Sequence, residues 1–234
     1  MRQIFSLIML WTRRSILRTA VLALLTAAAQ TVLFALAMRG GGSLEDVLYK
    51  GRPGIAAAVG FLLLCAQLYL VGGNFGSRQD YTLDRLAVGR GAGFACRWAA
   101  SALCVFVFWG AQAAAALWLC RLYSLLGGSP GPQAAVLAFY RNRFLHALLP
   151  LAEHGGYVRN AFICAALGAE SAGCGGKKRL FGIMPFAVLI WFRHPLGSLG
   201  LDVWICLFAA AVAAFSIFRL RSPHGEEEAD EALQ

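Results

Sequence analysis

The sequence predicts an all-α polytopic membrane protein with six transmembrane helices and an N-terminal interfacial helix. Hydrophobic residues make up 59% of the 234 residues and charged residues only 14%, whereas soluble domains are about half apolar. The apolar residues form long blocks, several of them near the roughly 20 residues that cross a bilayer as a helix. Because lipid cannot satisfy backbone amides and carbonyls, each block is expected to be helical.

At the N-terminus, residues 1–12 predict a helix that lies along the membrane surface. Apolar side chains surround this helix except for a narrow polar stripe of Arg2, Ser6 and Arg13, a pattern typical of interfacial helices. A ragged start to the first span is the alternative interpretation. The six expected spans are residues 15–38, 54–73, 99–120, 157–174, 180–192 and 199–218.

The fifth expected span is short. Its 13 residues correspond to about 20 Å of helix, and it contains Pro185. A helix that begins at Lys178 would lengthen it, since basic side chains can extend to the interface. If the segment only dips into the membrane, the C-terminal tail would lie on the opposite side.

Two loops are expected on the side away from the N-terminus. The glycine-rich residues 39–53 are predicted to be a short connector. In the longer loop, residues 133–149 predict one helix that ends before Pro150. Its apolar face favours a structural cap on the bundle, or a helix on the outer membrane surface, over a ligand site.

A polar stretch, GSRQDYTLDRLAVGRGAGF, separates the second and third expected spans. Ser77 and Asp80 fit the S-x-x-D form of a capping box, and Gly89 suits a left-handed helix end. The stretch therefore predicts a short amphipathic helix. The alternative is a connector resting on the lipid headgroups.

The distribution of basic residues predicts the orientation. Most of the 21 lysines and arginines fall on the side of the N-terminus, so the positive-inside tendency places both termini in the cytoplasm. The net charge of +9 thus fits a membrane protein, and no nucleic-acid partner is expected. Residues 1–221 form one membrane domain, followed by an acidic, disordered tail at residues 222–234.

Among the polar side chains inside the expected spans, the candidates for a pathway or for interhelical contacts are Gln30, Gln67, Gln112 and Glu170. Such residues are costly in hydrocarbon, and they either line a pathway or form hydrogen bonds between helices. Interhelical packing is favoured for the glutamines. Glu170 is close enough in sequence to Lys177 and Lys178 for a local ion pair.

Signatures of catalysis are missing from the sequence. The segment GAESAGCGGKK departs from a phosphate loop at Ser171 and Lys178. The seven cysteines are odd in number and lack C-x-x-C spacing, and no histidine has another at metal-ligand spacing. We therefore expect a non-enzymatic chain with no metal and no cofactor.

The predicted architecture resembles the ABC-2 type family of ABC transporter permeases. The shared features are the N-terminal amphipathic helix, six spans with both ends inside, and a short helix in the first cytoplasmic loop. The segment YTLDRLAVGR, residues 81–90, also looks like a sequence motif of permease-like bacterial proteins. One feature departs from many ABC-2 exporters, because the long external segment lies between spans three and four rather than five and six.

The resemblance implies a membrane-spanning permease subunit of the bacterial cytoplasmic membrane, which would act as an exporter. Its partners would be an ABC ATP-binding subunit and either a second copy or a similar permease. It makes the first-loop residues Tyr81, Thr82, Leu83, Asp84 and Arg85 the expected ATPase-coupling residues. The alternative is a non-transporting membrane scaffold or assembly protein, and missing repeat halves argue against a secondary transporter.

Overall fold

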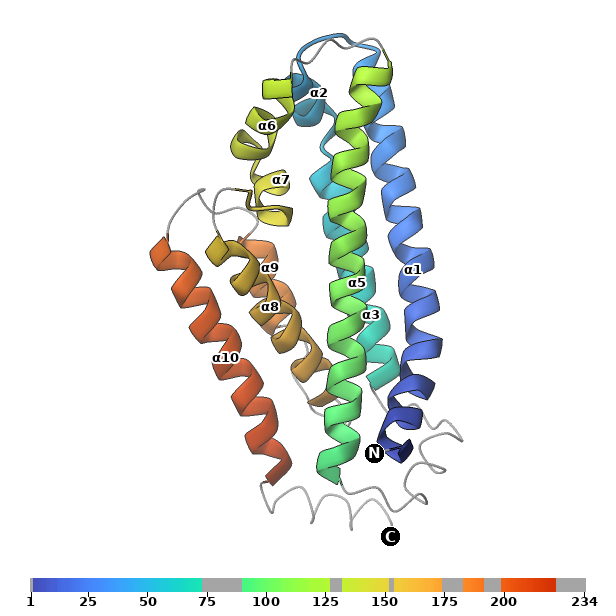
Figure 1. Cartoon of the computed structure of the whole chain (residues 1–234), viewed down its shortest axis with the longest axis vertical. Coiled ribbons are helices and arrows are strands. Elements are labelled where there is room, and N and C mark those ends of the chain that lie inside the picture. The colour runs from blue at the N-terminus through green and yellow to red at the C-terminus, as the bar shows by residue number, and fades with distance from the viewer. Residues whose placement is uncertain are drawn as a thin grey trace.

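The computed structural model describes residues 2–72, 90–126, 132–151, 154–173, 183–191 and 199–221. Within these ranges every regular element is a helix, so the predicted all-α class is confirmed (Figure 1). The elements are α1 (Arg2–Met38), α2 (Leu44–Gly51), α3 (Pro53–Gly72), α5 (Arg90–Leu125), α6 (Pro132–Arg141), α7 (Arg143–Leu148), α8 (His154–Gly173), α9 (Ile183–Trp191) and α10 (Leu199–Arg221).

Three helices among the described residues are long and apolar enough to cross a membrane. They are Ser15–Met38 within α1, Gly91–Leu125 within α5 and Gly200–Phe218 within α10. A fourth span is obtained if Leu44–Gly51 and Pro53–Tyr69, which are bent by 44° at their junction, count as one broken span. The chain thus has the character of an integral membrane protein, while the predicted number of six spans is not confirmed.

The two other helices at expected spans differ from a simple apolar crossing. α8 has 20 residues, but it carries Arg159 and Glu170. α9 has only nine residues, which give about 14 Å of helix against a hydrocarbon thickness of about 30 Å. Pro185 lies in the first turn of α9, where a helix amide has no intrahelical acceptor to lose.

The helices form an antiparallel bundle with two distinct ends. The N-terminal ends of α1 and α5 and the C-terminal end of α10 lie at one end, the lower end in Figure 1. The short helices α2, α6 and α7 lie at the opposite, upper end. α5 packs against α1 on one side and α8 on the other, and α10 packs on α8.

The N-terminal segment is continuous with the first long helix. α1 runs for 37 residues, about 55 Å at 1.5 Å per residue, so no break separates residues 1–12 from the expected first span. The structure therefore has one extended helix in place of an interfacial helix followed by a span. The side chains of residues 1–14 are outside the described residues, and the membrane-surface position of the polar stripe stays a prediction.

The predicted connector at residues 39–53 contains a helix, α2. Ser43 begins it with a capping box: the Ser43 hydroxyl accepts from the Asp46 amide at 3.3 Å, and the Ser43 amide donates to the Asp46 carboxylate at 3.2 Å. These reciprocal bonds satisfy amides that have no partner inside the helix. The connector prediction is therefore wrong.

The single helix predicted over residues 133–149 is also wrong, because two short helices occupy this segment. Asn142 separates α6 from α7 with an extended backbone at φ −82° and ψ 114°. Its side-chain oxygen accepts from the amides of Phe144 at 3.1 Å and Leu145 at 3.3 Å. Asn142 is thus the N-cap of α7, and an N-cap residue does not have helical backbone angles.

Small residues allow close helix packing in the bundle. A Cβ placed on Gly168 of α8 would lie 2.8 Å from both the Cβ and the backbone nitrogen of Ala102 in α5. Nearby, the Trp98 indole donates to the carbonyl of Ala165 at 2.7 Å. Gly60 of α3 similarly faces Thr26 of α1. Such contacts are typical of helices that associate in lipid, where van der Waals packing replaces the hydrophobic effect.

Candidate functional site

Two of the predicted polar residues meet in the interior of the bundle. Gln30 of α1 donates its Nε2 to the Oε1 of Gln112 in α5 at 2.7 Å, and to the carbonyl of Pro53 at 3.4 Å. The exposed fractions of Gln30 and Gln112 are only 1% and 2%. The pair therefore joins α1 and α5 through residues that are 82 positions apart.

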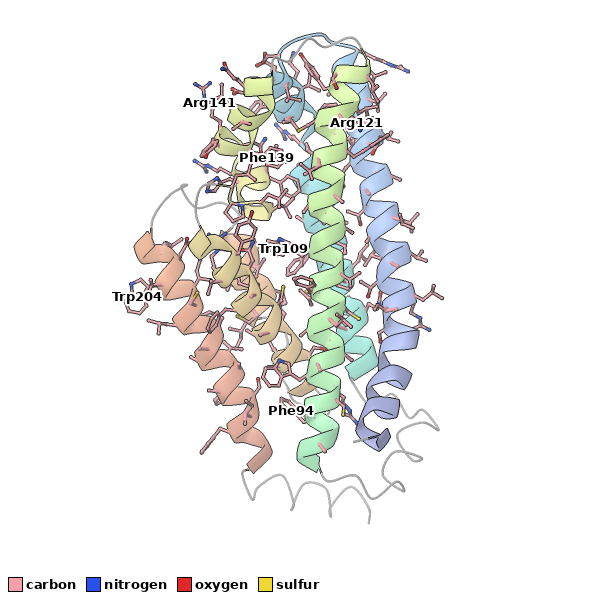
Figure 2. All side chains as sticks on the ribbon, in the orientation of Figure 1. Phe94, Trp109, Arg121, Phe139, Arg141 and Trp204 are labelled. Atoms are coloured by element: carbon pink, nitrogen blue, oxygen red, sulfur yellow. The ribbon has the colours of Figure 1, made fainter. Side chains whose placement is uncertain are left out.

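A cavity of about 1250 Å³ lies beside this pair, and Gln112 is one of the residues that line it. The walls come from α2, α3, α5, α6, α7 and α9 and from the junctions next to them. Most of the lining is apolar, and it includes Phe61, Val105, Phe108, Leu148, Phe186 and Leu189. Trp109 of α5 also lines the cavity on the side facing α7, where its indole donates to the Leu148 carbonyl at 3.2 Å (Figure 2).

The Gln112 amide nitrogen is the unusual atom of the cavity wall. Its Nε2 is buried and has no hydrogen-bond partner among the described residues, while the Oε1 of the same amide is engaged by Gln30. An unsatisfied buried donor costs about 1–3 kcal/mol. A group that brings an acceptor into the cavity next to Gln112 would remove this penalty.

Three arginines lie among the lining residues near the end of the bundle that holds α2 and α6. Arg52 occupies the junction of α2 and α3 in a left-handed conformation with φ 44°, and Arg143 begins α7. Arg141, at the end of α6 (Figure 2), forms an exposed ion pair with Glu45 of α2 at 3.3 Å. The cavity therefore combines an apolar interior with a positively charged end.

No family model, curated protein or solved structure matches this chain. The chemistry of the site follows from its own residues. The described lining residues include the Tyr49 phenol, the Gln112 and Asn142 amides and three guanidinium groups, and they include no carboxylate, imidazole, thiol or aliphatic hydroxyl. The arrangement suits non-covalent binding.

Gln67 lies outside the cavity. Its Nε2 donates to the carbonyl of Ser15 at 3.3 Å and to the hydroxyl of Thr19 at 3.4 Å. Both partners belong to α1, so Gln67 joins α3 to α1 nearer the end where the chain begins. Among the predicted polar residues, Gln30 and Gln112 are joined by a hydrogen bond.

Glu170 caps a helix. Its two carboxylate oxygens accept from the amides of Ile183 and Met184, the first two residues of α9, each at 3.1 Å. A carboxylate is favourable at this position because the first amides of a helix lack intrahelical acceptors and the helix dipole is positive there. The expected ion partners, Lys177 and Lys178, lie outside the described residues.

A buried ion pair between α8 and α10 was not predicted. The Arg159 guanidinium donates to the Asp202 carboxylate at 2.7 Å, and the two side chains are only 5% and 13% exposed. Arg159 also donates to the Asn160 side chain, which donates to the carbonyl of Ala147 in α7. The signal was present in the sequence, because Arg159 and Asp202 are charged residues inside expected spans.

The expected coupling residues, Tyr81 to Arg85, lie outside the described residues, so the structure gives no geometry for them. The chain positions that border them are the C-terminal end of α3 and the N-terminal end of α5. The start of α5 lies at the same end of the bundle as the start of α1 (Figure 1).

Proposed function

We propose that this chain is the membrane-spanning permease subunit of an ATP-driven ABC transporter, and that it acts as an exporter in the bacterial cytoplasmic membrane. In this proposal the chain crosses the membrane six times, with α9 as part of the fifth crossing, and both termini face the cytoplasm. A separate ATP-binding subunit supplies the energy, and a second copy or a similar permease completes the transporter.

The observation that carries the proposal is the cavity beside Gln112. It is large, it lies between helices of a membrane bundle, and its wall contains a buried donor without a partner. Ligand sites in proteins are typically mostly apolar cavities with a few placed polar groups. A scaffold that only holds other proteins together has no need of such an interior, so this feature favours transport over the scaffold alternative.

The arrangement of the chain ends supports the coupling part of the proposal. The segment that resembles a coupling helix, residues 81–90, connects α3 to α5, and the start of α5 lies at the same end as the start of α1 and the end of α10. A cytoplasmic ATPase would dock at this end. The cavity has its charged part toward the opposite end, which would then face outward.

Affinity purification of the intact chain from its native membranes in mild detergent tests the proposal. We expect mass spectrometry to identify a co-purified ATP-binding subunit. Charge reversal through Asp84→Lys and Arg85→Glu should reduce its recovery by about tenfold, equivalent to about 1.4 kcal/mol, because like charges that face each other across an interface weaken binding.

Charge reversal at Lys50 and Arg121 provides the matched control. Both residues are exposed and lie toward the opposite end of the bundle, so Lys50→Glu and Arg121→Glu should leave the recovery unchanged. Absence of an ATP-binding subunit from preparations with an intact melting transition would refute the proposal. Equal loss in both variant pairs would refute the assignment of residues 81–85.

A further inference from the structure

We propose that the cavity binds an anionic phospholipid, with its phosphate at the arginine end and an acyl chain along the apolar interior. In the proposed transporter this lipid would also be the transported substrate, and that part of the inference rests on the proposed function. The binding itself is a property of this chain alone.

The polar lining selects an acceptor-bearing, negatively charged head group. Arg52 makes no side-chain hydrogen bond or ion pair among the described residues, and Arg143 adds a second positive charge nearby. The side-chain oxygen of Asn142 is already used by two backbone amides. Since guanidinium groups bind phosphate through paired, charge-assisted hydrogen bonds, a phosphate is the complementary group at this end.

The apolar part of the cavity requires that the ligand carry a hydrocarbon chain. Arg52 immediately precedes α3, and Leu62 lines the cavity ten residues further along the chain, which is about 15 Å of helix. Phe186 and Leu189 of α9 complete the wall. A small hydrated anion would gain nothing from this surface, whereas an acyl chain would bury it.

The Gln112 amide fits between these two parts. Its Nε2 donor is buried without a partner, and it belongs to a wall whose neighbouring residues Phe108 and Trp109 are largely apolar. The ester carbonyl of a phospholipid lies between head group and acyl chain and accepts hydrogen bonds. It would satisfy the Gln112 donor while the phosphate contacts the arginines.

Photo-crosslinking of the purified, intact chain tests this assignment without an ATPase. The chain is reconstituted in phosphatidylcholine nanodiscs with a small amount of phosphatidic acid that carries a diazirine in its acyl chain. A phosphatidylcholine with the same diazirine chain serves as the matched probe. After irradiation, mass spectrometry of the digested protein maps the adducts.

We expect the phosphatidic acid probe to label the peptides of Val105, Phe108 and Phe186 several times more strongly than the phosphatidylcholine probe does. Arg52→Gln should lower this labelling by about three- to fivefold, the range of a partly exposed ion pair. Gln112→Glu retains the oxygen that accepts from Gln30 but replaces the donor nitrogen, and it should lower labelling by about tenfold.

Arg121→Gln is the control for the loss of positive charge. Arg121 is exposed on α5 toward the same end of the bundle and does not line the cavity (Figure 2). Ala58→Phe, which places a ring in the cavity wall, should reduce labelling by both probes. If Gln112→Glu fails to fold, Arg52→Gln and Ala58→Phe decide the result.

Three outcomes would overturn the inference. They are equal cavity labelling by both probes, adducts confined to the exposed faces of α1 and α10, and equal effects of Arg52→Gln and Arg121→Gln. Recovery of an ATP-binding subunit together with any of them would leave the proposed permease function standing and remove the lipid assignment. Specific labelling of the cavity by the phosphatidic acid probe, without any ATP-binding partner in the purified preparation, would support the lipid assignment and refute the proposed permease function.

Discussion

Replacement of Gly168 by alanine should destabilise the bundle, because α5 and α8 touch through their backbones at this position. The added Cβ would lie 2.8 Å from the backbone nitrogen and Cβ of Ala102, and 3.0 Å from its Cα. Ordinary contacts to a Cβ begin at 3.4 Å, so the shortfall is 3.4 − 2.8, or 0.6 Å. No side-chain rotation can provide this distance, and the helices themselves must separate.

The expected cost follows from the neighbouring contacts. Separation of α5 from α8 would also stretch the hydrogen bond from Trp98 to Ala165, now 2.7 Å, and the contact between the Ser101 and Ser171 hydroxyls, now 3.4 Å. Overpacking of this kind costs about 1–3 kcal/mol. Alanine is intrinsically better than glycine in a helix by about 0.5–1 kcal/mol, which is smaller and partly offsets the loss.

Equilibrium unfolding of the purified protein in mixed micelles measures this free energy. The matched control is Gly110→Ala in α5, where a Cβ would have no neighbour within 4 Å, so this variant should be neutral or slightly more stable. Ala102→Gly should partly rescue Gly168→Ala, because it removes the contact with the Ala102 Cβ, one of the two at 2.8 Å. A Gly168→Ala protein as stable as the Gly110→Ala protein would refute the backbone-contact argument.

Two further predictions concern the charged groups of α8. Arg159→Met should lower the free energy of unfolding by about 3–5 kcal/mol, because it leaves the Asp202 carboxylate buried without its partner. The double variant Arg159→Met/Asp202→Leu should lose less stability, because it removes the buried charge as well. Equal losses in the single and double variants would contradict this account. Glu170→Gln should speed hydrogen exchange in α9 without changing it in α3, because one of the two capped amides loses its acceptor, at about 1–3 kcal/mol. Unchanged exchange in α9, measured by mass spectrometry, would show that the cap contributes nothing.

The helices could be predicted from the sequence because their signal is local. Long apolar blocks give α1, α5 and α10, and composition alone indicates a membrane protein. A local signal also exists for α2, because Ser43 and Asp46 have the same S-x-x-D capping-box spacing as Ser77 and Asp80. The surrounding glycines, however, favour a connector over a helix in the sequence.

The site depends on contacts that sequence distance conceals. The sequence places both Gln30 and Gln112 inside expected spans, yet their pairing requires the packing of α1 against α5. From the sequence, Glu170 is expected to pair with Lys177 and Lys178, which are close to it in the chain. In the structure its carboxylate accepts hydrogen bonds from backbone amides 13 and 14 residues later. The cavity has no sequence signature, because its volume is set by the space that six helices leave between them.

The attachment of α10 has a mechanical consequence. α5 is held by α1, α3, α7 and α8, whereas the extensive contacts of α10 are with α8, and side chains such as Trp204 and Phe218 point away from the protein with 74% and 69% exposure. An outward displacement of α10 would thus disrupt one helix interface, and a displacement of α5 would disrupt several. Conformational change in this bundle should therefore concentrate at α10, with the Arg159–Asp202 ion pair as its pivot.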